Sequence, residues 1–284
     1  MAIGKYIDAH SHVWTHDTTR YPIASTFRVD EMKPASFPPE ELLRLCGPAG
    51  VGRVNLIQMS YYRFDNSYIL DMIVRYPDRF VGTAIVDPLG VDPAKAMSAL
   101  VPRGIRAFRI APSFSGKPGA AWLEPPGYAA MFAAAARLNV SLSCLIDPSG
   151  FAEVDRMCSH FPNTKVIIDH IGRIGIDGGI RDSEVAALKD LARHKNLYIK
   201  IGAFYALGLK KPPYLDLAPL IKSIVAAFGV ERCMWESDCP FQVVEHKYED
   251  SIALIRDRLE GLSRSDRDFL LYRTAEKLLF DRPR

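Results

Sequence analysis

Residues 6–12 read Tyr-Ile-Asp-Ala-His-Ser-His, a short apolar run that ends in two histidines two positions apart. Because side chains alternate along a β-strand, we expect His10 and His12 to share one face. Two imidazoles on one face can bind a common metal ion, although two surface histidines at a strand end would produce the same pattern. In parallel α/β barrels the catalytic groups stand at the carboxyl ends of the strands, where this pair lies.

Similar short apolar runs recur along the chain, separated by stretches with apolar residues at three- and four-residue spacing. The first pattern is typical of buried strands and the second of amphipathic helices. We predict eight strands, at Tyr6–Ala9, Arg53–Met59, Phe80–Val86, Ile105–Ile110, Leu142–Ile146, Val166–Asp169, Leu197–Ile201 and Cys233–Glu236. We predict helices at Asn66–Tyr76, Pro93–Leu100, Tyr128–Leu138, Phe151–Phe161, Ser183–His194 and Leu215–Phe228, and a helical tail from about Glu249 to Phe280.

Strand and helix in alternation predict parallel βαβ units, and eight such units predict an α/β fold, a (β/α)8 TIM barrel. A doubly wound open sheet is the alternative, but its G-x-G-x-x-G fingerprint is missing. No linker divides the sequence, so we expect one barrel domain over residues 1–284. The long connection 13–39 follows the first strand, on the catalytic side of a barrel, where we expect a lid or substrate wall. A shorter loop of this kind is marked by Pro212 and Pro213.

The composition narrows the class of protein further. The chain has 284 residues, and 36 basic against 33 acidic side chains leave a net charge of +3. This small excess argues against nucleic acid or membrane as the main partner. The amino terminus lacks the charged start and apolar core of a signal peptide, and five scattered cysteines suit a reducing compartment. We therefore expect a cytoplasmic enzyme, and leave open whether it assembles into a homo-oligomer.

Two more polar residues follow predicted strands. His170 ends the sixth strand, and Asp238 follows the eighth. Either could have a local structural role, as a buried histidine or a turn cap. Strand eight of a closed barrel lies beside strand one, however, which would bring Asp238 next to His10 and His12. Three imidazoles and one carboxylate at one rim are much more specific for an active site than any one of them.

Several segments carry a resemblance to a known family. They are IDAHSHVW, IQMSYYRFDNSYILDMIVRYPDRFVGTAIVDP, GIRAFRI, VIIDHIGR, NLYIKIGAF and MWESDCP. In this order they resemble the amidohydrolase-related family of the amidohydrolase superfamily. That family includes 2-pyrone-4,6-dicarboxylate lactonase, sugar lactonases and the metal-dependent aminocarboxymuconate-semialdehyde decarboxylase. The tyrosine-rich turn after strand two and the IDHIGR segment are most similar to the lactonases.

The resemblance implies an amidohydrolase-like barrel that hydrolyses a small carbonyl substrate, with His10, His12, His170 and Asp238 as metal ligands and His170 and Asp238 as catalytic residues. One divalent ion, zinc or manganese, is expected at most, because strand five lacks the lysine of binuclear relatives. Some relatives keep these residues and work without a metal, so metal-independent action stays open. Glu236 stands where relatives usually have glycine, which makes the barrel floor unusual.

Cations and phenols cluster near the same predicted strand ends. Arg63, Arg109 and Arg173 follow or occupy strands two, four and six, with Tyr61 and Tyr205 nearby. Each arginine alone is more often a solvated surface residue. Together they indicate a substrate-binding site for a small acid, because a guanidinium binds a carboxylate through two parallel hydrogen bonds.

These observations favour a lactonase-like hydrolase, acting on a lactone that carries a carboxylate or hydroxyl groups. In this hypothesis Asp238 takes a proton from water and returns it to the leaving oxygen. The alternatives are a metal-dependent, non-oxidative decarboxylase of a small unsaturated or aromatic acid, and a barrel retained for binding alone. Two further expectations concern buried charges. Lys200 and Glu236, on adjacent strands, should pair directly if both point inward, and Asp169 should lie on the strand face opposite His170.

Overall fold

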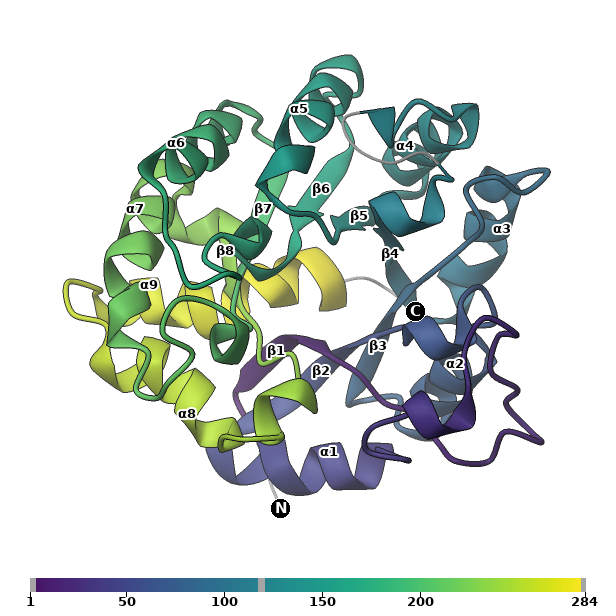
Figure 1. Ribbon diagram of the computed structural model, residues 1–284, viewed down its shortest axis with the longest axis horizontal. Helices are drawn as coiled ribbons and strands as arrows, with labels where there is room; N and C mark the ends of the chain where they lie inside the picture. The colour runs from purple at the N-terminus through teal and green to yellow at the C-terminus, as the bar shows by residue number, and fades with distance from the viewer. Residues whose placement is uncertain (1–3, 117–120, 282–284) are drawn as a thin grey trace.

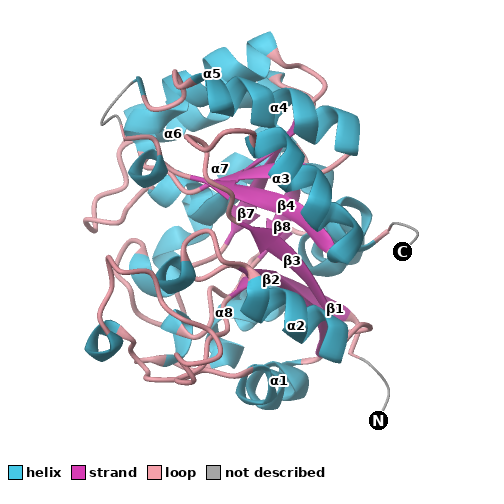
Figure 2. Ribbon diagram, turned by 90° about the vertical axis from the view of Figure 1, so that its right-hand side faces the viewer, coloured by secondary structure: helices cyan, strands magenta, loops and turns pink. Residues whose placement is uncertain are grey.

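The computed structural model describes residues 4–116 and 121–281. Eight parallel strands follow one another around a barrel in chain order, as Figures 1 and 2 show. They are β1 Tyr6–Ser11, β2 Val51–Ile57, β3 Phe80–Ala84, β4 Ile105–Ile110, β5 Ser141–Cys144, β6 Lys165–Ile168, β7 Leu197–Ile201 and β8 Cys233–Trp235. The predicted (β/α)8 barrel is therefore confirmed, with β4 and β7 at the predicted bounds.

Helices surround the strands on the outside of the barrel (Figure 1). They are α1 Pro39–Cys46, α2 Ser67–Arg75, α3 Pro93–Leu100, α4 Pro126–Leu138, α5 Phe151–His160, α6 Asp182–Asp190, α7 Ala218–Phe228, α8 Tyr248–Ala253 and α9 Arg264–Asp268. The predicted tail is helical in several short pieces, since wider helical turns continue α8 and α9 at 254–258, 269–273 and 276–280. None of the described helices is long and apolar enough to cross a membrane.

The barrel closes where the ends of β1 and β8 meet. The Asp238 amide donates to the His10 carbonyl at 2.9 Å, and the His12 amide donates to the Cys239 carbonyl at 2.7 Å. Ser11 and Cys239 form a parallel bridge at the same place. This closure places Asp238 beside the two histidines of the first strand, as the sequence predicted.

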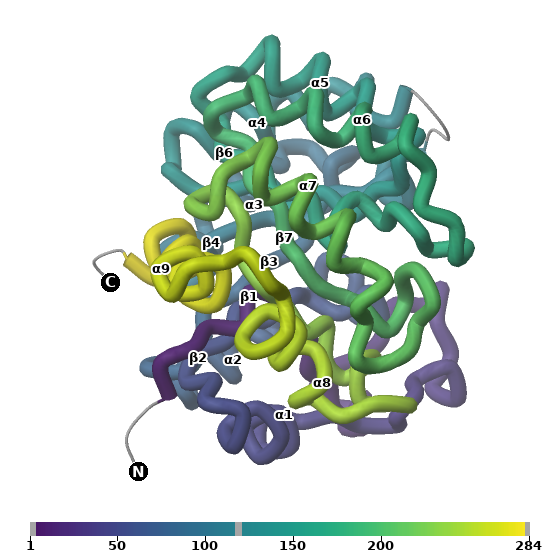
Figure 3. The backbone as a smooth tube through the Cα atoms, turned by 90° about the vertical axis from the view of Figure 1, so that its left-hand side faces the viewer, coloured from purple at the N-terminus to yellow at the C-terminus, as the bar shows by residue number. Residues whose placement is uncertain are grey.

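The barrel interior is built in layers, which is how side chains of alternate strands fill such barrels. An apolar layer is formed by Ile7, Ala9, Val81, Ala107, Ile167 and Met234. The C-terminal turns close the barrel below it through Ala275, Leu278 and Leu279, so the first and last segments of the chain lie side by side (Figure 3). Two residues further along the strands comes a polar layer, defined here as Thr83, Arg109, Ser143, Asp169, Lys200 and Glu236, all of them buried.

Candidate active site

The polar layer pairs its charges in a way that the sequence did not indicate. Lys200 and Glu236 are both fully buried, as expected for inward-facing residues. The predicted contact between them is wrong, because the Lys200 ammonium pairs with Asp169 Oδ1 at 2.9 Å. Ser143 donates to the same oxygen at 2.7 Å, and the Arg109 guanidinium lies 3.4 Å from Asp169 Oδ2. Burial raises the pKa of Asp169, but the Lys200 charge outweighs it and holds that pKa well below its usual range.

Asp169 therefore faces the barrel interior with Lys200 and Arg109, so its predicted position on the strand face opposite His170 is wrong. Asp169 stands two positions after Ile167 of the apolar layer, so it shares the inward face of β6. His170 and Ile171 both adopt left-handed backbone conformations, with φ of 56° and 53°. This turn lets Asp169 stay in the polar layer while His170 reaches the rim above it.

Glu236 orients two of the histidines from below. Its Oε1 accepts from the His170 backbone amide at 3.1 Å and lies 2.6 Å from His170 Nδ1. Its Oε2 lies 3.0 Å from His10 Nδ1. Burial raises the pKa of Glu236, but its interactions with His170 and His10 bring it down to about 2. Space for this side chain comes from Gly202, where a Cβ would lie 2.2 Å from Glu236 Cγ.

His10, His12 and Asp238 converge on one point. His10 Nε2 and His12 Nε2 are 3.2 Å apart, and Asp238 Oδ1 lies 3.5 Å and 3.3 Å from them. The ligand atoms of a tetrahedral zinc site with bonds of 2.0–2.1 Å are separated by about 3.3 Å. His12 Nδ1 faces the Ile57 carbonyl at 3.0 Å, so its Nε2 lone pair points inward. His10 Nδ1 lies 3.0 Å from Glu236 Oε2 and 3.1 Å from the Lys200 ammonium. Burial lowers the pKa of His12 to about 4, which keeps that ring neutral.

These three residues therefore fit one divalent ion. Asp238 Oδ1 is buried and has no hydrogen-bond donor among the described residues. His170, the fourth predicted ligand, forms a ligand-type group with His10 and Asp238, and its Nε2 lies 4.0 Å from Asp238 Oδ2. Arg109 would compete with an ion for His10, because its Nη2 lies 3.1 Å from His10 Nε2.

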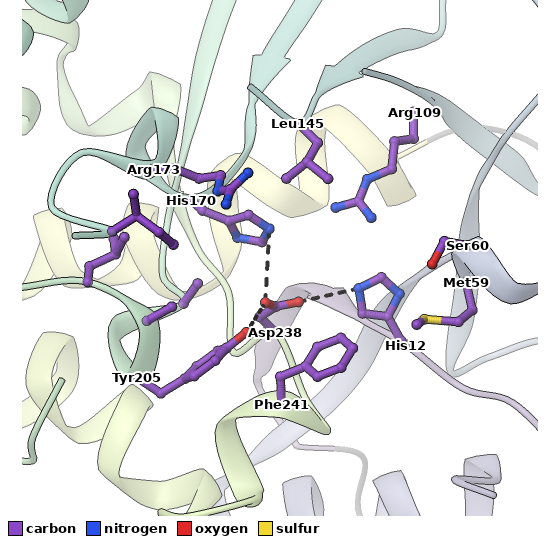
Figure 4. A pocket seen from close by; sticks show the side chains of 14 residues that line it. His12, Met59, Ser60, Arg109, Leu145, His170, Arg173, Tyr205, Asp238 and Phe241 are labelled. Carbon is purple, nitrogen blue, oxygen red and sulfur yellow. Dashed lines mark hydrogen bonds and ion pairs between the residues drawn. The ribbon is translucent and has the colours of Figure 1, made fainter. Parts of the chain in front are cut away.

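Asp238 receives polar contacts on its other oxygen as well. The Tyr205 hydroxyl donates to Oδ2 at 2.7 Å, as Figure 4 shows. Burial raises the pKa of Asp238, but the nearby charge of His170 holds it far below its usual range. Burial and the nearby Asp238 charge raise the pKa of Tyr205, so the phenol remains a donor. For His170, burial lowers the pKa, but the Glu236 carboxylate raises it overall.

A cavity of about 350 Å³ opens above these residues. Figure 4 shows Asp238 near its centre, between His12 and His170. The described residues that line it are His12, Met59, Ser60, Arg109, Leu145, His170, Arg173, Ile176, Ala203, Tyr205, Ala206, Leu207, Asp238 and Phe241. The loop after β7 thus contributes a wall, whereas the long connection 13–39 contributes none of these lining residues.

The predicted substrate-binding residues divide into two groups. Arg109, Arg173 and Tyr205 line the cavity, but Tyr61 and Arg63 do not. The Tyr61 hydroxyl donates to the Glu31 carbonyl, and the Arg63 guanidinium stacks on Phe64 at 5.2 Å. The position of these two residues after β2 did not predict where their side chains lie. The 3-10 turn Ser60–Tyr62 and the positive φ of Arg63 direct both side chains away from the cavity.

Sequence reasoning missed Ser143 and the role of Asp169 in this site. The sequence did contain a pattern that identifies part of this layer. Thr83, Arg109, Asp169 and Glu236 each stand two positions after a member of the apolar layer. Two-residue periodicity counted from those apolar residues would have identified Asp169 as an inward-facing group.

Comparisons with known proteins agree with this geometry. The sequence pattern of the family described as "Amidohydrolase" matches residues 7–280. L-fucono-1,5-lactonase from Burkholderia ambifaria is 25% identical over 82% of this chain and 80% of its own. A 4-sulfomuconolactone hydrolase from Rhizobium radiobacter is 26% identical over 82% of this chain and 75% of its own.

A solved structure shares the whole fold. It is a protein described as a probable 2-pyrone-4,6-dicarboxylic acid hydrolase from Acinetobacter baumannii, with citric acid bound. The two structures superpose with a TM-score of 0.81 at 22% identity, over 97% of this chain and 99% of the other. The family match over almost the entire barrel confirms the resemblance drawn from the strand-end motifs, and this chain belongs to the amidohydrolase family.

Proposed function

We propose that this enzyme hydrolyses a small lactone. The observation that carries the proposal is the meeting of His10, His12 and Asp238 at one side of a cavity that also contains Arg109 and Arg173. Opening a lactone requires a base for water, donors for the oxyanion and a proton for the leaving oxygen. Relatives that cover most of this chain are named as lactone hydrolases, which supports this reaction over others on the same scaffold.

In the proposed mechanism, Asp238 accepts the proton of the attacking water. Its carboxylate is ionised at neutral pH, and the Tyr205 hydroxyl holds its Oδ2 in place. His170, oriented by Glu236, presents its Nε2–H to the oxyanion that forms from the ring carbonyl. Asp238 then returns the proton to the leaving alkoxide, and the ring opens to a hydroxy acid.

The residues also fit a bound metal ion. His10, His12 and Asp238, with His170 beside them, would hold one zinc or manganese ion. When bound, such an ion supplies Lewis-acid polarisation of the carbonyl and lowers the pKa of a bound water. In either case the proton carrier proposed from this chain is Asp238.

The test of this proposal is an Asp238→Asn variant. Asparagine keeps the size of aspartate but cannot accept a proton, so we expect kcat for lactone opening to fall by about two to four decades while the protein stays folded. The control is Asp177→Asn, which changes an exposed carboxylate in a surface pair with Arg181. Asp169 is unsuitable as a control because it contacts Lys200 and Arg109. Near-normal turnover of a folded Asp238→Asn protein would contradict the mechanism.

Product analysis separates the hydrolase from the decarboxylase alternative. A lactonase converts its substrate to a hydroxy acid of equal carbon number and consumes one water, whereas a decarboxylase releases carbon dioxide. We expect only ring opening, measured by NMR of the products over a panel of lactones and of unsaturated and aromatic acids. Carbon dioxide release without lactone opening would favour the decarboxylase.

A further inference from the structure

We infer that the cavity selects a lactone that carries a carboxylate and few or no hydroxyl groups, and that it disfavours polyhydroxylated sugar lactones. This inference rests on the proposed lactone hydrolysis and names the substrate class. It follows from the hydrogen-bonding groups that the cavity wall offers once the reacting residues have been assigned.

Half of the lining residues described above offer no polar side chain. They are Met59, Leu145, Ile176, Ala203, Ala206, Leu207 and Phe241. The other half includes His12, His170 and Asp238, which contact one another and the reacting atoms. Tyr205 donates its hydroxyl to Asp238. Only Ser60, Arg109 and Arg173 then remain for recognition of the rest of the substrate.

A sugar lactone needs acceptors as well as donors, since each of its hydroxyl groups brings one O–H into the site. Among these three residues Ser60 alone can accept a hydrogen bond, because a guanidinium is a donor only. The described wall has no asparagine, glutamine or glutamate, and its one aspartate is the proposed base. Several substrate hydroxyls would therefore lose their hydrogen bonds to water and face Met59, Leu145 or Phe241.

A carboxylate needs only hydrogen-bond donors, and Arg109 and Arg173 offer such donors to the cavity. Arg109 is 7% exposed, and its Nε has no hydrogen-bond partner among the described residues. Among the described residues, this side chain makes hydrogen bonds through Nη2 alone, to His10 and Asp169. The guanidinium lines the cavity and carries five N–H donors, so donors remain for a substrate carboxylate. Arg173 is more exposed and pairs with Asp147 at 3.2 Å, so we assign it a position at the entrance.

The guanidinium groups and the Phe241 ring lie on different sides of Asp238 in the cavity (Figure 4). Figure 4 shows Leu145 between the two guanidinium groups, and the Phe241 ring on the other side of Asp238. A flat lactone acid can direct its carboxylate toward Arg109 and its hydrocarbon edge toward Phe241 and Met59. The ring carbonyl then lies within reach of His170 and Asp238.

Three probes with the same five-membered ring test the inference. They are 5-oxotetrahydrofuran-2-carboxylate, assayed as both enantiomers, its neutral carboxamide, and D-ribono-1,4-lactone, which carries hydroxyl groups and no carboxylate. Ring opening is followed by NMR, and kcat/KM is compared. We expect the acid to exceed the carboxamide by about one to two decades, the value of a charge-assisted hydrogen bond. We expect it to exceed ribonolactone by about two decades or more.

Two variants identify the residues responsible. Arg109→Met should lower kcat/KM for the acid by about one to two decades more than for the carboxamide, so the ratio between the two substrates falls. A merely structural role for Arg109 would lower both substrates alike. Met59→Gln keeps the volume of the side chain and adds an acceptor, so it should raise the ratio of ribonolactone to acid turnover.

Binding measurements keep this inference separate from the proposed reaction. Calorimetry with the unreactive ring analogues tetrahydrofuran-2-carboxylate and 1,4-anhydroribitol should show at least tenfold tighter binding of the acid to the wild-type protein. If no lactone is opened but the acid binds selectively, lactone hydrolysis fails and the anion preference stands. If ribonolactone is opened as fast as the acid, or the polyol binds as tightly, the inference is overturned.

Discussion

His10, His12 and Asp238 bring three ligand atoms to the separation that a tetrahedral ion requires, and this leads to the first prediction. We expect the purified protein, stripped with chelator and then reloaded, to bind one equivalent of zinc or manganese. A second group of ligand-type residues, His10, Asp169 and Glu236, lies below the first. The Lys200 ammonium stands 2.9 Å from Asp169 and already supplies a positive charge there.

The measurement is metal content by mass spectrometry. His10→Ala or His12→Ala should weaken binding by at least tenfold, because each removes one of three ligands. The control is His160→Ala, an exposed histidine on α5. Two tightly bound equivalents in the wild-type protein would contradict the assignment.

Glu236 and His170 form a buried pair whose charge depends on pH. Glu236 has its pKa lowered from 4.5 to about 2, so its stabilising contribution is present above pH 4.5 and lost as pH falls toward 2. His170 has its pKa raised above 6.5, so its contribution is complete below pH 6.5 and lost as pH rises through the raised value. The pair should therefore stabilise the fold most between about pH 4.5 and 6.5.

A Glu236→Gln variant tests this window. In the presence of chelator, the difference in free energy of unfolding between wild type and variant should be largest between those pH values and should shrink on both sides. NMR titration should also show a lower pKa for His170 in the variant, because the carboxylate that stabilises its imidazolium has been removed. An unchanged His170 pKa would show that Glu236 does not control this ring.

At the scale of strands, β6 and β7 are joined inside the barrel by the ion pair of Asp169 and Lys200. Lys200→Met leaves Asp169 buried without its main cation, and we expect a loss of about 3–5 kcal/mol in the free energy of unfolding. The double variant Lys200→Met/Asp169→Asn removes both charges and should recover part of that loss. Denaturant unfolding of the two single variants and the double variant measures the coupling. Additive losses would mean that the pair does not interact.

At the scale of the whole molecule, the closure of the barrel depends on Asp8. Its carboxylate accepts from Ser11 at 2.7 Å, from the Ser237 hydroxyl at 2.5 Å and from the Tyr248 hydroxyl at 2.7 Å, and all four residues are buried. It therefore ties β1 to the segment after β8 and to α8. These strands come from opposite ends of the chain, so their contact is the last link of the closed sheet.

We expect Asp8→Ala to cost about 3–5 kcal/mol, because several buried donors lose their acceptor together. The melting temperature of the whole barrel should fall in one cooperative transition, measured by calorimetry. Asp177→Asn again serves as the control, since an exposed ion pair contributes about 0–1 kcal/mol. A melting temperature unchanged by Asp8→Ala would show that closure is maintained by backbone contacts alone.

The sequence alone was sufficient to predict the barrel, seven of its helices or helical regions, and the meeting of His10, His12, His170 and Asp238. The physical reason is that these features depend on local periodicity and on one topological rule: the carboxyl ends of parallel strands share one rim. A pattern of buried runs and the order of the strands are enough to apply that rule.

Only the tertiary structure decided which charges pair and which side chains reach the cavity. Lys200 pairs with Asp169 rather than with Glu236, and left-handed residues after Asp169 carry His170 to the rim. Glu236 instead holds His170 and His10, in space left by Gly202 on the neighbouring strand. Tyr61 and Arg63 turn away after β2. Such choices depend on backbone angles and distances of a few ångströms between residues far apart in the chain, which no local pattern in the sequence encodes.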